Sequence, residues 1–149
     1  MRDLRTSNTI TIKAPQHEVW RALTTPELIK EWFFGVDTET DWNVGSPLVH
    51  RGVWQGKAYE DKGKIVRISP PDVLVHTHWS PLSGLPDQPE SYQEVTWTLA
   101  SRGVATDLTV AEENLPSAEA RAVSEKAWAT VLGNLKRVLE RTDALPKTA

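Results

Sequence analysis

The sequence contains no cysteine among its 149 residues. Without thiols, the chain forms no disulfide and holds no thiolate metal or redox site. A chain of this length is able to bury a substantial core without such covalent support. We therefore expect packing alone to hold the fold together.

Long apolar runs are missing as well. The first residues include Arg2, Asp3 and Arg5 and have no apolar run behind them, so no ordinary signal peptide is expected. No stretch approaches the roughly 18 apolar residues that a membrane-spanning helix needs. These absences predict a soluble, cytoplasmic protein that does not insert into membranes.

The chain also lacks an excess of basic residues. It has 17 Lys and Arg against 20 Asp and Glu, a formal net charge of -3. Proteins that bind nucleic acid usually present a basic patch or stripe, so no nucleic-acid partner is expected. Four catalytic signatures are missing too: the Gly-Xaa-Ser-Xaa-Gly elbow, His-Glu-Xaa-Xaa-His, a phosphate-binding glycine-rich loop and a dinucleotide fingerprint. Common hydrolase, kinase and NAD-dependent classes are disfavoured, and we expect neither a cofactor nor a metal.

Tryptophan, by contrast, is abundant. The chain has seven tryptophans against two tyrosines and two phenylalanines. A tryptophan adds a large buried area together with one polar N–H group. Two interpretations follow: these side chains fill the core, or some of them line a ligand pocket.

Alternating polar and apolar residues predict strands, and proline, glycine and aspartate separate them. The expected strands are 9–13, 36–40, 48–54, 57–68, 73–79, 92–100 and 104–113. Two short helices are expected at 16–23 and 26–32, and Gln55-Gly56 predicts a hairpin turn. Consecutive strands with short turns favour an antiparallel meander.

A long amphipathic helix is expected from about residue 116 to 141. Its apolar stripe consists of Val123, Ala127, Trp128, Val131, Leu132, Leu135, Val138 and Leu139. Such a helix must lie across the sheet in order to bury its stripe. The pattern predicts one α+β domain over residues 1–149, with a core at about 8–141 and frayed ends.

Several segments carry a family resemblance. They are Ile12-Lys-Ala-Pro-Gln-His-Glu-Val-Trp20, Glu31-Trp-Phe33, Gly63-Lys-Ile-Val-Arg-Ile-Ser-Pro-Pro71, Val95-Thr-Trp-Thr-Leu99 and Trp128-Ala-Thr-Val-Leu132. They resemble the Bet v 1/START-like (SRPBCC) superfamily, in the branch of the activator of Hsp90 ATPase C-terminal domain. The resemblance implies a helix-grip fold, in which a curved antiparallel sheet of order β-α-α-β6-α wraps around the C-terminal helix.

This superfamily includes lipid and hormone carriers, polyketide cyclases and a co-chaperone domain, so the fold alone does not define the function. Our leading hypothesis is the binding of a small, largely apolar ligand (a lipid, an aromatic or a polyketide-like molecule) between the sheet and the long helix. One alternative is a cyclase- or hydrolase-like enzyme that uses His and Glu side chains of the cavity. Another is a co-chaperone-like module whose partner is a chaperone, and a homodimer is a further option.

His76 and His78 are the main polar candidates. Residues two apart on a strand share a face, and the resemblance turns this face inward. The two imidazoles could orient a polar ligand group, transfer protons, or bind a metal together with His50 or Glu112. They could also be hydrogen-bonded core residues without chemistry.

The candidate ligand-binding set is therefore Trp54, His76, His78, Trp97, Leu108, Glu112, Trp128 and Leu132. No catalytic residue is assigned and no metal is expected. The proline-rich loop 80–90 is expected to shape the mouth of the cavity.

Overall fold

The computed structural model describes residues 4–144 of the chain. The elements are β1 (Thr6–Ile12), α1 (Gln16–Thr24), α2 (Pro26–Trp32), β2 (Asp37–Glu39), β3 (Pro47–Trp54), β4 (Lys57–Ser69), β5 (Val73–His78), β6 (Gln93–Arg102), β7 (Ala105–Glu113) and α3 (Ala118–Ala144). Two short 3-10 helices, η1 (Pro81–Ser83) and η2 (Pro89–Ser91), lie between β5 and β6. This order confirms the predicted β-α-α-β6-α arrangement.

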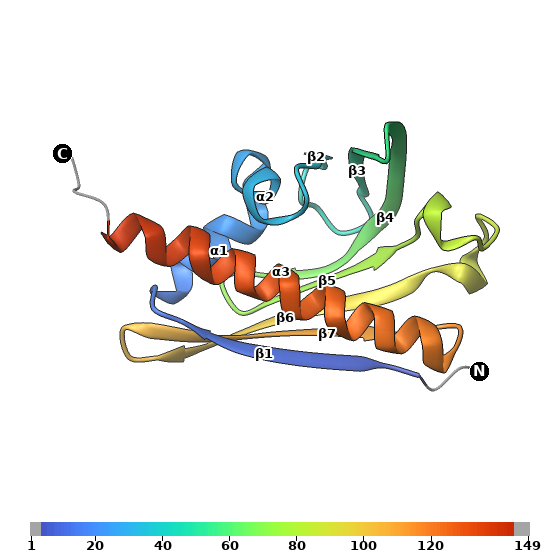
Figure 1. The fold of residues 1–149 in the computed structure, drawn as a ribbon. Helices are drawn as coiled ribbons and strands as arrows, with labels where there is room; N and C mark the ends of the chain where they lie inside the picture. Colours follow the sequence, from blue (N-terminus) through green and yellow to red (C-terminus); the bar gives the residue numbers. More distant parts are fainter. Residues whose placement is uncertain (1–3, 145–149) are drawn as a thin grey trace.

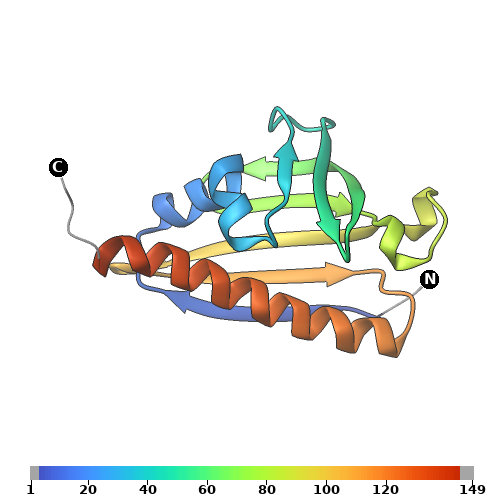
Figure 2. The ribbon, with the colours of Figure 1, turned by 45° about the horizontal axis from the view of Figure 1, so that its top comes forward.

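The strands form a single antiparallel sheet. Its order is β1-β7-β6-β5-β4-β3-β2, so the first strand pairs with the last one. The sheet curves around α3, which crosses its concave side (Figures 1 and 2). The expectation of a helix-grip fold is confirmed.

Two glycines shape the β3–β4–β5 region. Gln55 and Gly56 have φ angles of 52° and 79°, and positive values at both central residues define the tight hairpin turn between β3 and β4. Gly63 lies so close to β5 that a Cβ atom there would stand 1.8 Å from the Thr77 carbonyl oxygen. A bulge follows between Ile65 and Arg67, and bulges bend the strand that carries them.

The apolar stripe of α3 is buried over only part of its length. The buried members are Val131, Leu132, Leu135, Val138 and Leu139. Val123, in contrast, is 69% exposed, and Ala127 is also exposed. The prediction of one continuous buried stripe is therefore wrong for the first turns of α3. The Asn8 side chain of β1 donates to the Glu125 backbone oxygen there at 3.3 Å, but Val123 and Ala127 stay exposed.

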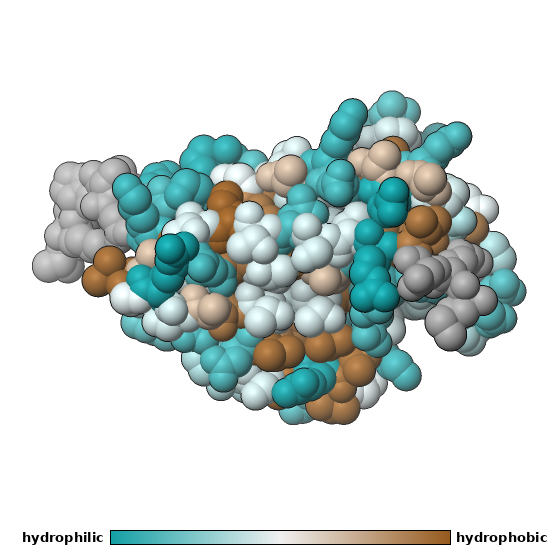
Figure 3. Space-filling view, turned by 90° about the horizontal axis from the view of Figure 1, so that it is seen from below, coloured by the Kyte–Doolittle hydropathy of each residue, from teal (hydrophilic) through white to brown (hydrophobic). Residues whose placement is uncertain are grey.

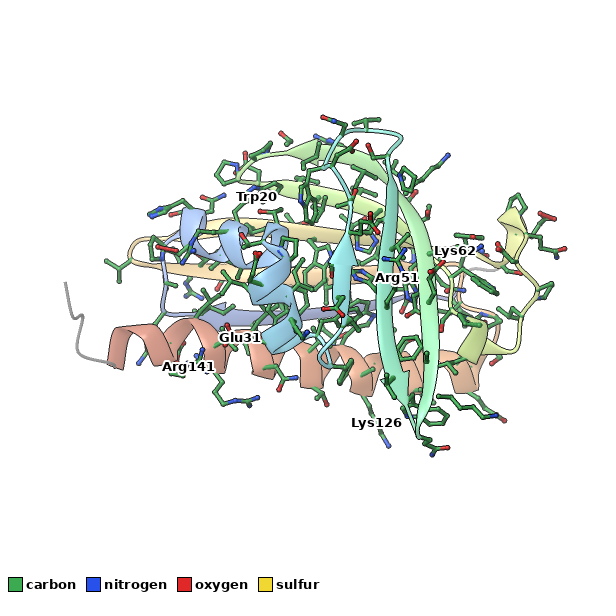
Figure 4. The ribbon with its side chains drawn as sticks, turned by 90° about the horizontal axis from the view of Figure 1, so that it is seen from above. Trp20, Glu31, Arg51, Lys62, Lys126 and Arg141 are labelled. Atoms are coloured by element: carbon green, nitrogen blue, oxygen red, sulfur yellow. The ribbon has the colours of Figure 1, made fainter. Side chains whose placement is uncertain are left out.

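Polar contacts anchor the second half of α3. The Asn134 side-chain amide donates to the backbone oxygen of Trp32 at 3.2 Å, and Lys136 donates to the Thr11 carbonyl at 2.9 Å. Arg141 pairs with Glu31 of α2 at 2.6 Å, and Figure 4 labels both residues. The helix is thus fixed at one end to α2 and β1.

The outer face of the sheet is polar over β1 and β7. The Thr9 and Thr109 hydroxyls are hydrogen-bonded at 2.8 Å, and Thr11 donates to Asp107 at 2.6 Å. Figure 3, seen from below, shows mostly pale and teal residues in the middle of this face. Among the helices described here, none combines the length and hydropathy that a membrane crossing requires.

Candidate functional site: a cavity beneath the first half of the long helix

A cavity of about 230 Å³ lies between the concave side of the sheet, α2 and the first half of α3. Its apolar wall consists of Leu23, Ile29, Trp32, Phe33, Phe34, Trp42, Leu48, Leu74, Val95, Trp97, Ala127, Trp128 and Val131. Its polar residues are His50, Tyr59, Asp61, His76, His78, Glu112 and Ser124. Figure 4, seen from above, shows how α2, the β3–β4 hairpin and α3 stand around this side of the sheet.

Aromatic rings form a continuous part of the wall. The ring centroids of Trp128 and Trp97 are 5.4 Å apart with planes at 89°, and those of Trp97 and Trp32 are 5.8 Å apart at 70°. Phe33 continues the row, 5.6 Å from Trp32. Edge-to-face contacts of this kind stabilise a pair beyond the burial of its area. The wall is thereby held in a defined shape.

The indole N–H groups of this wall are engaged within the protein. Trp97 Nε1 donates to His76 Nε2 at 3.2 Å, and Trp128 Nε1 donates to Glu112 Oε1 at 2.9 Å. Trp32 Nε1 donates to the backbone oxygen of Ala22 at 2.9 Å. An indole has this one donor and no acceptor, so these three side chains offer a ligand only their apolar surface.

His76 is held as a neutral imidazole. Its Nε2 accepts from Trp97, so the hydrogen lies on Nδ1, which donates to the Thr77 carbonyl at 3.1 Å. Burial disfavours the charged form and lowers the pKa of His76 to about 4. With both nitrogens engaged, this residue is poorly suited to transfer protons near neutral pH, which weakens the enzyme hypothesis based on His76, His78 and Glu112.

Asp61 and His78 form a second polar pair in the wall. His78 Nε2 lies 3.1 Å from Asp61 Oδ2, and a carboxylate only accepts, so the imidazole donates. Within residues 4–144, the buried Oδ1 of Asp61 has no hydrogen-bond partner. Such an unsatisfied acceptor is costly to bury.

His50 lies beside this pair on β3. Its Nδ1 is 2.8 Å from the Thr38 hydroxyl, and it is paired across the hairpin with Asp61. Burial, with smaller contributions from His76 and His78, lowers the pKa of His50 to about 3. Among the described residues, no group of three or more His, Cys, Asp or Glu side chains is arranged to hold a metal ion.

The cavity brings together five of the predicted site residues: His76, His78, Trp97, Glu112 and Trp128. Sequence reasoning missed Asp61. A two-residue turn at Gln55-Gly56 implies the pairing of His50 with Asp61, so the signal for it was present in the sequence.

The other three predicted residues lie elsewhere. Trp54 is the last residue of β3, beside the hairpin turn, and is 55% exposed, so it is not part of the cavity wall. Leu108 and Leu132 are 0% and 2% exposed and belong to the packed core. None of the described residues of the loop 80–90 is among those that line this cavity.

Comparisons with known proteins agree with this architecture. The model of the family "Activator of Hsp90 ATPase homolog 1-like protein" matches residues 13–140. The structure of ChR145 from Cytophaga hutchinsonii is 39% identical, covers 97% of this chain and 100% of that chain, and has a TM-score of 0.83. No curated protein sequence matches the chain.

Two further structures share the fold. DynU16, from the dynemicin biosynthetic locus, is 25% identical over 93% of this chain and 48% of that chain, with a TM-score of 0.76. The Aha1 dimer from Colwellia psychrerythraea is 23% identical over 91% of this chain and 96% of that chain, with a TM-score of 0.72. At these identities the likeness concerns the arrangement of the elements.

Proposed function

We propose that this chain, which belongs to the activator of Hsp90 ATPase homolog 1-like family, binds a small aromatic molecule in the cavity beneath α3. The observation that carries the proposal is the row of Trp128, Trp97, Trp32 and Phe33 along one wall of that cavity. Mostly apolar lining with a few polar groups is typical of ligand sites.

The size of the cavity narrows the class of ligand. Sites for drug-sized molecules usually enclose about 300–1,000 Å³. A cavity of about 230 Å³ is smaller and suits one or two fused rings better than a long acyl chain or a large polyketide. Among the ligand classes named from the sequence, the aromatic one fits best.

The first half of α3 supports the same proposal. Ala127, Trp128 and Val131 line the cavity, and Ala127 remains exposed. Burial of apolar surface contributes roughly 25 cal/mol per Å². A ligand that covers this part of the helix would therefore gain free energy from surface that the protein leaves open.

An NMR titration with 2-naphthol tests this function. We expect saturable shifts of the Trp97 and Trp128 indole resonances, and weakened binding in Ala127→Phe, whose ring would occupy the cavity. Ala129→Phe is the matched control, because Ala129 is exposed on the same helix and does not line the cavity. Saturable binding that Ala127→Phe leaves unchanged would count against the site.

A second candidate function is self-association through the tip of the β3–β4 hairpin. Val53 and Trp54 are 71% and 55% exposed at this tip, and large apolar groups in such positions favour protein contacts. Sedimentation velocity at increasing concentration tests it. We expect a dimer that Trp54→Ser dissociates, and a monomer at all concentrations would dispose of the candidate.

A further inference from the structure

We infer that the ligand of this cavity is a neutral or cationic aromatic molecule that donates a hydrogen bond, and that aromatic carboxylates are rejected. The inference rests on the proposed function and names the chemistry that the same cavity selects. It follows from which polar atoms of the wall are already engaged and from the charges that the wall carries.

The polar atoms of the cavity wall that can still form a hydrogen bond are mainly acceptors. The Asp61 side chain is 10% exposed, lines the cavity, and has one oxygen without a partner among the described residues. Glu112 is 5% exposed and uses Oε1 to accept from Trp128, whereas a carboxylate has several acceptor sites. A ligand satisfies such atoms only by donating to them.

The donors of the wall are largely used up. The indoles of Trp32, Trp97 and Trp128 donate to Ala22, His76 and Glu112 respectively. Tyr59 and Ser124 contribute hydroxyls, which both donate and accept. His50 contributes the ring nitrogen that does not face Thr38, and Trp42 contributes an indole at a partly exposed position. A ligand carboxylate would therefore find few donors deep in the cavity.

The charges of the wall also disfavour an anionic ligand. Among the described residues, the lining contains no Lys and no Arg, but it contains Asp61 and Glu112. His76 is neutral because it is buried and its Nε2 accepts from Trp97, and His78 already directs its Nε2 hydrogen to Asp61. An anion that leaves water for this cavity would meet two carboxylates without a free cation to offset its desolvation.

A matched series of probes tests the selection. Naphthalene, 2-naphthol, 2-naphthylmethylamine and 2-naphthoate share one ring system and differ in the polar group. By calorimetric or NMR titration at pH 7, we expect 2-naphthol and the amine to bind about tenfold more tightly than 2-naphthoate, a difference of about 1.4 kcal/mol.

Variants of the wall carboxylates test whether these groups cause the selectivity. Asp61→Asn removes the charge and is expected to reduce the preference for the amine over 2-naphthoate roughly fivefold. Glu60→Gln is the matched control, because the neighbouring Glu60 is exposed and pairs with Arg51 instead. If Asp61→Asn does not fold, Glu112→Gln takes its place, since its amide oxygen still accepts from Trp128.

The outcomes separate this inference from the proposed function. If naphthalene and all three derivatives fail to bind, the proposed function itself fails. If 2-naphthoate binds as tightly as 2-naphthol and the amine, the cavity is a ligand site but the inferred selectivity is overturned. A preference that survives unchanged in the folded acidic-residue variant also overturns the inference.

Discussion

Mild acid should destabilise this protein through its buried histidines. His50 and His76 have folded pKa values of about 3 and about 4, below the ordinary value of 6.5, because burial disfavours their charged forms. Below pH 6.5 the unfolded chain binds protons that the folded chain does not. Stability is therefore complete above pH 6.5 and falls as the pH drops towards the folded pKa values.

The expected loss in the free energy of unfolding follows from these pKa values. Between pH 7 and pH 5, each histidine contributes a loss of about 2 kcal/mol, or about 4 kcal/mol for the two together. This loss is a large part of the usual 5–15 kcal/mol free energy of unfolding. Over the same range, ordinary carboxyl groups with pKa values near 4 change little.

Urea denaturation at pH 7, 6 and 5, followed by tryptophan fluorescence, measures the effect. His76→Gln keeps an acceptor for the Trp97 indole but does not titrate, so the loss between pH 7 and pH 5 should shrink by about 2 kcal/mol. His17→Gln is the control, because His17 is exposed on α1 and its removal should leave the pH dependence intact. If His76→Gln and the parent lose the same free energy, the assignment to His76 is refuted.

Three further substitutions test the packing by urea denaturation at pH 7. Gly63→Ala should lower the free energy of unfolding by about 3 kcal/mol or more, because its Cβ would lie 1.8 Å from the Thr77 carbonyl oxygen, and a loss below about 1 kcal/mol would contradict the close approach. Gly133→Ala has open space around its Cβ within α3 and should raise stability by about 0.5–1 kcal/mol, whereas a loss would show an unrecognised constraint there. Thr106→Val removes a buried hydroxyl that donates to the Ala14 carbonyl at 2.8 Å and should cost about 1–3 kcal/mol, so an unchanged midpoint would show that another group satisfies that oxygen.

Local patterns in the sequence were sufficient to predict the helices and strands, and for many side chains the face of the sheet on which they lie. Alternation along β6 and β7 placed Trp97 and Glu112 on the inner face, because successive side chains of a strand point to opposite sides. The turn at Gln55-Gly56 was predictable because a two-residue hairpin favours positive φ at both positions. These features depend on residues close together in the chain.

Other features depend on the distance between layers, which only the tertiary structure decides. Helical periodicity placed Val123 and Val131 on one face, but Val131 is buried in the core and Val123 is exposed. Trp54 is a large aromatic residue of the kind that lines cavities, but it lies at the end of β3 beside the hairpin turn, is exposed, and does not line the cavity. The hairpin turn predicts the pairing of Asp61 with His50, but its contact with His78 at 3.1 Å depends on how β4 and β5 pack. A period in the sequence shows which face a side chain occupies, whereas the spacing of the layers determines whether that face is filled by the core or left open for a ligand.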